Sequence, residues 1–307
     1  MLKLEALRIT FGDTALLRGL DLEIKQGETH GLVGESGSGK SIAALAIMGL
    51  LPPGLMASGR VMLGAENLLA LEESAMARRR GRAIAMVFQE PMSALNPVHR
   101  VGRQIAEGMV QHSLRDSRAA MLEAARLLEH VGLGAERASA YPHHLSGGQR
   151  QRVLIAMAMA MAPQVLIADE PTSALDASLQ GAVLDLLADL ARERAMAMLL
   201  ISHDLGVIAQ RTQSLTVLYG GAVMESGATE AILARPRHPY TQGLLGALPR
   251  GKARGARLSP IPGQVPAPPD LAPGCPFHGR CPRGDARCRS TAPPLQHGAF
   301  CFYPEDA

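Results

Sequence analysis

A glycine-rich segment near the N-terminus carries residues that could bind phosphate. Residues 34–41 read GESGSGKS, and they follow a strand-like segment and open a helix-like one. Glycines allow backbone N–H groups to converge on phosphate oxygens, Lys40 supplies positive charge, and Ser41 offers a hydroxyl to Mg²⁺. The motif in this setting predicts a phosphate-binding loop rather than a glycine-rich turn without a ligand.

Two acids, Asp169 and Glu170, end the apolar segment of residues 164–168. Acids at this place would lie at the carboxyl edge of a parallel sheet, where α/β proteins form ligand sites. Asp169 would hold a metal ion, directly or through water, and Glu170 would polarise an attacking water. An acid at the end of a strand often only caps the next helix. The presence of a phosphate loop in the same chain favours a role in metal binding and hydrolysis instead.

A third segment, residues 145–149, reads LSGGQ. A Ser-Gly-Gly step that opens a helix presents N–H groups and the helix dipole to an anion. This is a second phosphate-facing element, for which a single small nucleotide-hydrolysing domain has no obvious need.

These three elements resemble those of the ATP-binding subunits of ABC transporters, whose LSGGQ signature stands here unaltered. In that family two ATPase subunits pack head to tail, and the signature of one closes over the nucleotide held by the phosphate loop of the other. The resemblance implies ATP and Mg²⁺ as cofactors and dimeric action. It assigns nucleotide binding to Phe11, Gly34, Ser36, Gly37, Ser38, Gly39, Lys40, Ser41, Ile42, Ser146, Gly147, Gly148, Gln149 and Asp176.

Other positions are similar to further elements of this family. Phe11 resembles the aromatic residue that stacks on adenine, although it could instead be a core residue of a strand. Gln89 resembles the glutamine that approaches Mg²⁺ and the attacking water, with a surface glutamine as the alternative. Asp176 matches the loop that crosses the dimer interface and could also cap a helix. His203 matches the switch histidine that contacts the γ-phosphate.

The resemblance also implies which of these residues are catalytic and which bind Mg²⁺. Ile42 departs from the Ser or Thr of many relatives, so an α-phosphate contact there would rely on the backbone N–H. The implied catalytic residues are Glu170, His203 and Gln89, and the implied Mg²⁺ ligands are Ser41, Gln89 and Asp169.

Strand-like and helix-like segments alternate along the chain. Residues 28–33 precede a helical pattern over 40–50, and residues 165–168 precede one over 177–194. This alternation indicates a largely parallel sheet that is covered by helices.

Two regions depart from the alternation. Residues 96–161 contain amphipathic stretches and no strong strand, which predicts a helical subdomain. From residue 236 onward frequent prolines interrupt regular structure. We therefore expect an α/β fold, with a P-loop ABC ATPase core over residues 1–235, the helical subdomain inserted in it, and a Pro-rich, four-Cys C-terminal tail over residues 236–307.

Composition limits the class of partner. The net charge of +3 is too small to indicate a nucleic-acid-binding protein. The first residues read as a strand rather than a secretory signal, and the longest apolar runs, residues 42–51 and 153–162, are shorter than the ~20 residues that span a bilayer. We expect a peripheral protein on the cytoplasmic face of the inner or plasma membrane, attached through a partner.

The C-terminal tail resembles that of one subfamily of these ATPases. Residues 238–249 and 261–263 resemble the C-terminal region of the ATPases of oligopeptide, dipeptide and nickel transporters. Several ATPases of this kind carry a four-cysteine tail with a [4Fe–4S] cluster.

All four cysteines lie in this tail, separated by five, six and twelve residues, at Cys275, Cys281, Cys288 and Cys301. Without a sign of secretion, metal ligands or free thiols are favoured over disulfides. Structural zinc usually has closer Cys pairs, so the spacing favours an iron–sulfur cluster. Zinc and reduced cysteines remain alternatives, as does ligation by His278 or His297.

The sequence thus predicts the ATP-hydrolysing motor of an importer of di- or oligopeptides. The implied partners are a second homologous ATPase in a heterodimer, two transmembrane permease subunits and an external solute-binding protein. Uptake of nickel, metallophores or opines is the alternative. A soluble ABC ATPase that acts on nucleic acid or ribosomes is a remote alternative. We would expect such a protein to have a long coiled coil or a second ATPase domain, and this sequence shows neither. Glu170 and His203 disfavour a subunit that does not hydrolyse ATP.

Overall fold

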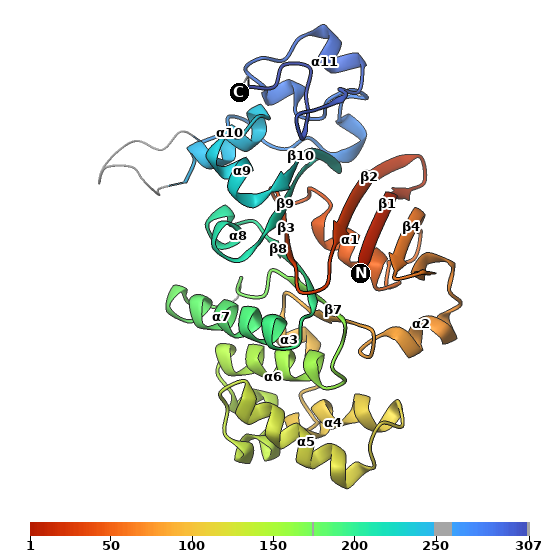
Figure 1. The fold of residues 1–307 in the computed structure, drawn as a ribbon, viewed down its shortest axis with the longest axis vertical. Helices are drawn as coiled ribbons and strands as arrows, with labels where there is room; N and C mark the ends of the chain where they lie inside the picture. The colour runs from red at the N-terminus through yellow and green to blue at the C-terminus, as the bar shows by residue number, and fades with distance from the viewer. Residues whose placement is uncertain (174, 249–259, 306–307) are drawn as a thin grey trace. The chain divides into compact units, whose positions relative to one another are not determined.

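The computed structural model describes residues 1–173, 175–248 and 260–305, which form two compact units (Figure 1). The first unit contains Met1, residues 25–28 and residues 70–199, and the second contains the other described residues. Across these ranges, none of the helices combines the length and apolar character that a bilayer-spanning helix needs.

A four-stranded antiparallel sheet belongs to the second unit. Its strand order is β2-β1-β4-β5, with β1 (Leu2–Phe11), β2 (Thr14–Ile24), β4 (Leu55–Leu63) and β5 (Glu66–Asn67). The alternating apolar residues of β1 predict this strand, but the sequence analysis did not separate an antiparallel sheet from the parallel one.

A bulge in β1 explains why its buried positions change phase. Leu2 and Leu4 are buried, and the next buried residues are Leu7 and Ile9. The pairing register shifts between Leu4 and Leu7. The opposite strand accommodates the bulge at a glycine, Gly59, where a Cβ would stand only 2.5 Å from a backbone carbonyl oxygen of β1.

The second unit also contains strands of a mixed sheet. The strand β3 (Thr29–Val33) pairs in parallel with β9 (Ser214–Tyr219), which pairs antiparallel with β10 (Ala222–Ala228). Beyond β10, two short strands form the edge of this sheet: β12 (Ala299–Phe300) pairs with β10, and β11 (Leu295–Gln296) pairs with β12. The helices of this unit are α1 (Lys40–Ile47), α8 (Leu205–Arg211), α9 (Thr229–Ala234), α10 (Pro239–Gly246) and α11 (Ala286–Ser290), with 3₁₀ turns at Pro268–Asp270 and His278–Arg280.

The first unit is mostly helical. Its helices are α2 (Glu73–Arg79), α3 (Pro91–Ala94), α4 (Val101–Gln111), α5 (Ser117–His130), α6 (Gly147–Met159) and α7 (Ala177–Glu193), with 3₁₀ turns at Ala135–Ser139 and Pro142–His144. The strands β6 (Ile84–Val87) and β7 (Val165–Asp169) pair in parallel. The strand β8 (Ala197–Ser202) begins in this unit and ends in the second, and the 3₁₀ turn at Leu68–Ala70 spans another of the boundaries along the chain.

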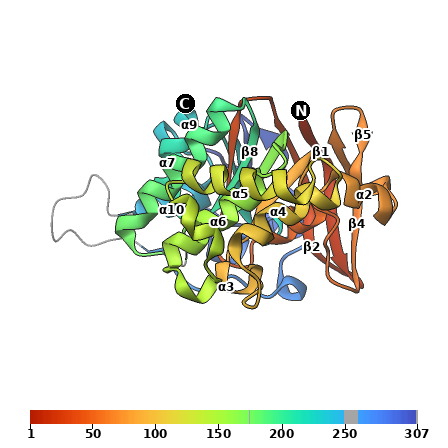
Figure 2. The ribbon, with the colours of Figure 1, turned by 90° about the horizontal axis from the view of Figure 1, so that it is seen from below.

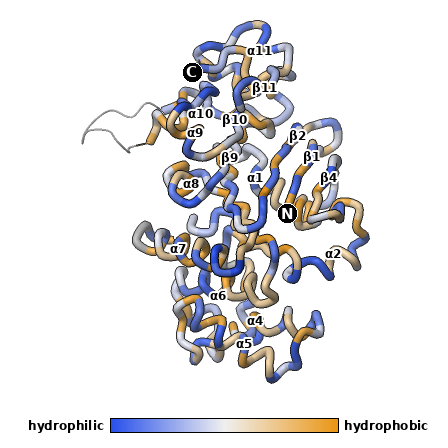
Figure 3. Tube along the Cα trace, in the orientation of Figure 1, coloured by the Kyte–Doolittle hydropathy of each residue, from blue (hydrophilic) through white to orange (hydrophobic). Residues whose placement is uncertain are grey.

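Helices α4, α5 and α6 pack against one another (Figure 2). Along α4 and α5 the apolar residues are interleaved with hydrophilic ones, as amphipathic helices require, whereas the second half of α6 is a continuous apolar run (Figure 3). Helices α4 and α5 each bury one side, with Ile105 and Ala124 at 1% exposure or less, whereas α6 is buried on nearly all sides from Val153 to Met159.

The predicted alternation agrees with the observed elements to within a few residues. The predicted strands over 28–33 and 165–168 are β3 and β7, and the predicted helices over 40–50 and 177–194 are α1 and α7. Among the described residues 96–161 the structure contains helices and 3₁₀ turns and no strand. The predicted boundaries of a core over 1–235 and a tail over 236–307 do not coincide with the two units and stay a prediction.

Candidate nucleotide site

The phosphate loop connects β3 to α1, and its backbone is possible only with glycine at particular positions. Gly37 and Gly39 have φ of 77° and 99°, a left-handed conformation that other residues rarely adopt. At Gly34, an added Cβ would overlap the carbonyl oxygen of Leu218 on the neighbouring strand. These glycines keep the loop compact.

Lys40 folds back over this loop. Its Nζ donates to the carbonyl oxygens of Gly34 at 2.8 Å and Glu35 at 3.0 Å, and lies 3.4 Å from Ser38 Oγ. Lys40 and Ser38 are buried. A positive charge is thus held inside the curve of the loop, the position from which a lysine would reach phosphate oxygens.

Phe11 ends β1 and is 59% exposed. Its ring lies over Gly54, where an added Cβ would be 3.0 Å from Phe11 Cε2. The alternative interpretation as a core residue is therefore wrong. An exposed ring is free to stack on a base, and its role at adenine stays a prediction.

Gln89 and Glu170 meet although 81 residues separate them in sequence. The parallel pairing of β6 and β7 sets Val87 opposite Ala168, so both strands end at the same edge. Gln89 follows one strand and Glu170 the other, and Gln89 Nε2 donates to Glu170 Oε2 at 3.3 Å. The structure therefore brings together the predicted base and the predicted glutamine.

The acid before Glu170 has a different environment. Asp169 is buried as the last residue of β7, whereas Glu170 is half-buried and has a φ of 44°. A positive φ is costly for a residue with a side chain, and such strain is concentrated at functional sites. The turn at Glu170 directs the chain away from the strand and is closed by Ser173, whose hydroxyl donates to the Glu170 carbonyl oxygen at 3.1 Å.

The signature segment opens α6 with a capping box. Ser146 accepts a hydrogen bond from the Gln149 N–H at 3.3 Å, and the Gln149 side chain accepts one from the Ser146 N–H at 3.0 Å. The sequence analysis did not identify this reciprocal pair, although the Ser-x-x-Gln spacing is its usual signal. The N–H groups of Gly147 and Gly148 are at helix positions that lack an intrahelical acceptor, so they can face an anion.

Two further predicted residues lie at element ends. Asp176 occupies the N-cap position of α7, but its side chain accepts no capping hydrogen bond, so the predicted cap is present only by position. His203 directly follows β8 and is exposed, and Asp204 caps α8 by accepting from the Gly206 N–H at 2.6 Å. Phe11, the phosphate loop and His203 belong to the second unit, and Gln89, Asp169, Glu170, the signature and Asp176 belong to the first.

The four cysteines line one small cavity of about 10 Å³, together with His238, His278 and Tyr303. His297 does not line it. No disulfide joins the thiols, and burial raises the pKa of each of them, that of Cys275 to about 12. Within the described residues, no three His, Cys, Asp or Glu side chains are grouped closely enough to hold a single metal ion.

His238 is the other buried titratable group at this cavity. Burial lowers its pKa to about 3, so the ring is neutral at physiological pH. Its Nδ1 accepts a hydrogen bond from the Tyr240 N–H at 3.0 Å and so caps α10. A capping role explains this histidine without a metal.

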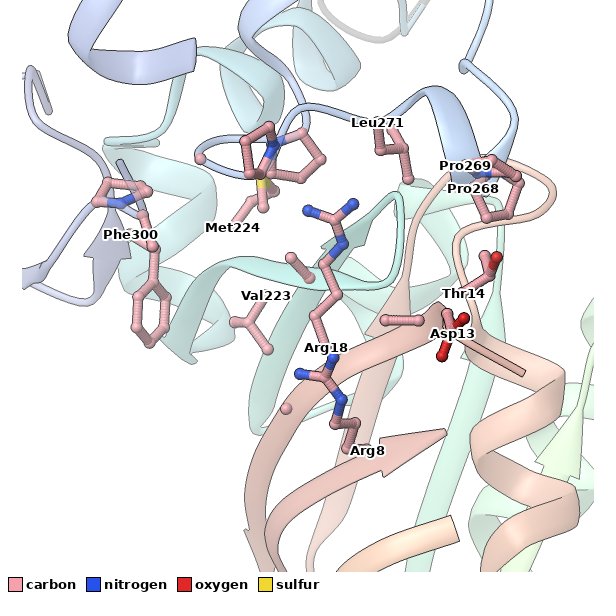
Figure 4. A pocket seen from close by; sticks show the side chains of 18 residues that line it. Arg8, Asp13, Thr14, Arg18, Val223, Met224, Pro268, Pro269, Leu271 and Phe300 are labelled. Atoms are coloured by element: carbon pink, nitrogen blue, oxygen red, sulfur yellow. The ribbon is translucent and has the colours of Figure 1, made fainter. Parts of the chain in front are cut away.

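A larger pocket of about 710 Å³ lies in the second unit between the β1–β2 hairpin and the C-terminal segment, which comprises the described residues 236–248 and 260–305 (Figure 4). Arg8, Arg18 and Asp13 line it beside several prolines. Arg18 Nη1 donates to the Ala272 carbonyl oxygen at 2.8 Å, and burial, with the nearby Arg8 charge, lowers the pKa of Arg18. None of the residues that the sequence analysis assigned to nucleotide or metal binding lines this pocket.

The phosphate loop also touches a residue set that the sequence analysis did not find. Arg280 and Tyr240 reach Glu35 from the C-terminal segment. No local motif signals these contacts, because 245 residues separate Arg280 from Glu35.

A glycine-rich loop that leads from a parallel strand into a helix, and acids that end a second parallel strand, define a P-loop nucleotide-hydrolysing protein. The sequence profile of the ABC transporter family matches residues 17–173, and that of the oligopeptide/dipeptide transporter C-terminal region matches residues 224–288. The chain belongs to the ABC transporter family and is an ATP-hydrolysing subunit of it.

Individual proteins support this assignment. The chain is 42% identical to the dipeptide transport ATP-binding protein DppD of Escherichia coli, over 100% of this chain and 97% of that protein. It is 44% identical to DppD of Bacillus subtilis, over 92% and 86%. The ATP-binding cassette MJ0796, solved as a dimer in a post-hydrolysis state with ADP and phosphate, shares 28% identity at a TM-score of 0.67, covering 75% of this chain and 99% of that one.

Proposed function

We propose that this chain is one of two ATPase subunits that drive import of di- or oligopeptides across a membrane. The match of residues 224–288 to the oligopeptide/dipeptide transporter C-terminal region is the observation that carries the cargo class. The relatives named for dipeptide transport align along nearly the whole chain. A homologous ATPase, two permease subunits and an external solute-binding protein would complete the transporter, with this chain bound peripherally at the cytoplasmic face.

ATP hydrolysis would begin with binding of the nucleotide and its metal ion. The phosphate loop with Lys40 would bind the phosphates, and Phe11 would stack on adenine. Mg²⁺ would be held by Ser41, Asp169 and Gln89. It needs no preformed cage of protein ligands, because Mg²⁺ usually keeps several waters and is completed by substrate phosphates. When bound, it neutralises charge that develops on the phosphates.

Other residues of the chain would activate the water and contact the nucleotide. Glu170 would polarise the attacking water, while Gln89 holds the Glu170 carboxylate in place. His203 would contact the γ-phosphate. The signature segment, with Ser146, Gly147, Gly148 and Gln149, would close over the nucleotide of the partner ATPase, and Asp176 would lie at the same interface.

Uptake of labelled peptide tests the cargo class. A strain that lacks this chain is complemented with the wild type or with Lys40→Ala, and uptake of a radiolabelled dipeptide is compared with uptake of nickel. Restoration of dipeptide uptake by the wild type alone supports the proposal. Restoration of nickel uptake without peptide uptake would replace it by the alternative cargo.

We also propose that the four cysteines hold a [4Fe–4S] cluster. All four thiols line one cavity, which is the donor set that such a cluster requires. We favour a cluster over zinc on the spacing of the cysteines along the chain, because structural zinc usually has closer Cys pairs. When bound, the cluster would supply the positive charge that keeps buried thiolates ionised.

Metal analysis of the anaerobically purified chain tests this second proposal. We expect about four iron and four sulfide per chain, with loss of both in Cys288→Ser, whereas the neighbouring control Ser290→Ala retains them. Stoichiometric zinc, or neither metal, would exclude the cluster.

A further inference from the structure

Glu35 lies at the centre of a set of contacts that ties the phosphate loop to the C-terminal segment. Its carboxylate accepts two hydrogen bonds from Arg280, at 2.6 Å from Nη1 to Oε2 and 3.2 Å from Nη2 to Oε1. Its N–H donates to the Tyr240 hydroxyl at 2.9 Å. Its carbonyl oxygen accepts from Lys40 Nζ at 3.0 Å. One residue therefore connects the phosphate-binding lysine with two residues of the C-terminal segment.

Arg280 is fixed in this position by its other contacts. Only 8% of its side chain is exposed. Nε donates to the Pro262 carbonyl oxygen at 2.8 Å, Nη2 to that of Ile261 at 3.3 Å, and Nη1 to the Tyr219 hydroxyl at 3.3 Å. A guanidinium held in this way presents two parallel donors to a carboxylate, which is the strongest form of charge-assisted pair.

Tyr240 is held by an aromatic cluster. The rings of Tyr219, Tyr240 and Phe277 are fully buried, and their centroids lie 4.8 to 5.2 Å apart. Phe277 is two residues after Cys275, and Arg280 directly precedes Cys281. Both supports of Glu35 therefore depend on the segment that carries the cysteines.

We propose that Arg280 and Tyr240 are positioning residues for ATP binding, and that through them the C-terminal segment sets the affinity of the phosphate loop for ATP. Two effects act together. The contacts fix the backbone of Glu35, from which Lys40 also takes its position, so the loop is ordered before the ligand arrives. Arg280 also neutralises the Glu35 carboxylate, which would otherwise repel the phosphates of ATP. The inference rests on ATP binding and not on the cargo.

The charge effect makes a prediction that a merely structural role does not. We expect Arg280→Gln to leave an uncompensated acid beside the phosphates and to raise the Kd for ATP about tenfold, within the usual range of coupling between contacting residues. Glu35→Gln removes the acid itself and should change the Kd much less. The double variant Arg280→Gln/Glu35→Gln should therefore bind ATP more tightly than Arg280→Gln alone.

Binding of ATP to the full chain is measured by isothermal titration calorimetry, and thermal unfolding of each variant is recorded beside it. The matched control is Arg287→Gln, which removes another arginine of the same segment, one that stacks 3.9 Å from the Phe302 ring centroid and not on the phosphate loop. Tyr240→Phe tests the second support and should also raise the Kd.

A raised Kd in Arg280→Gln that Glu35→Gln suppresses, with an unchanged Kd in Arg287→Gln, supports the proposal. An unchanged Kd in Arg280→Gln overturns the proposal, and a double variant as weak as Arg280→Gln overturns its charge effect. Failure of the wild type to bind ATP would instead contradict the proposed ATPase function, so the two failures are distinguishable.

Discussion

The Gln89 side chain donates a hydrogen bond to the Glu170 carboxylate across 3.3 Å, where two parallel strands end at the same edge. An amide donor at this place limits how the Glu170 carboxylate can turn. The pair supports the proposed role of Glu170 as general base.

Replacing Glu170 by Gln should remove the base and leave the fold intact. We expect ATP turnover to fall at least about 100-fold, as is typical for loss of a general base, with little change in ATP affinity. Steady-state phosphate release and calorimetric ATP binding measure the two quantities. Gln89→Ala, which keeps the carboxylate but frees it, should cost less. Turnover close to wild type in Glu170→Gln would show that another residue activates the water.

The phosphate loop should be intolerant of a methyl group at Gly34. A Cβ there overlaps the Leu218 carbonyl oxygen, and backbone cannot move aside as a flexible side chain can. We expect Gly34→Ala to destabilise the chain by about 1–3 kcal/mol and to abolish ATP binding.

Gly181→Ala is the matched control for that change. Gly181 lies within α7, and a Cβ there meets nothing within 4 Å. Alanine should therefore stabilise the helix by roughly 0.5–1 kcal/mol. Urea unfolding compares both variants, and equal effects at the two glycines would contradict the steric argument.

The capping box at the signature predicts a stability effect for Ser146. Ser146→Ala removes the acceptor of the Gln149 N–H at the start of α6. We expect a loss of about 1 kcal/mol in the free energy of unfolding, the usual cost of a lost N-cap. Ser146→Asp, which restores an acceptor, should recover this stability. If both variants unfold like the wild type, the signature serine has no role in holding the helix.

Sequence patterns predict the features of this site that depend on neighbouring residues, but they do not predict side-chain contacts between segments far apart in the chain. The phosphate loop, the acids after β7 and the signature are contiguous motifs whose chemistry depends on neighbouring residues, and the elements that hold them have the predicted helical or strand periodicity. The contact of Arg280 with Glu35 depends on which segments pack together, and spacing does not encode that. Gln89 and Glu170 were assigned to one site by the family resemblance, and their hydrogen bond follows from the pairing of β6 with β7.

The same limit applies to the bulge in β1. Its phase change depends on Gly59 in a different strand, so the alternation of β1 alone does not explain it. For the cysteines, the spacing predicted a common site. All four line the same small cavity.

Two aspartates, Asp116 and Asp176, occupy helix N-cap positions, and comparing their variants distinguishes an effect on stability from an effect on ATP turnover. Asp116 caps α5 by accepting from the Ala119 N–H at 2.8 Å, whereas the Asp176 side chain at the start of α7 accepts no such bond. Asp116→Ala should therefore cost about 1 kcal/mol of stability and leave ATP turnover unchanged. Asp176→Ala should leave stability within about 0.5 kcal/mol, as is usual for surface changes, and lower turnover of the assembled ATPase dimer, because its carboxylate is available to a partner subunit. Urea unfolding and phosphate release measured on both variants give the comparison. A stability loss in Asp176→Ala as large as in Asp116→Ala, with normal turnover, would return Asp176 to a purely structural role.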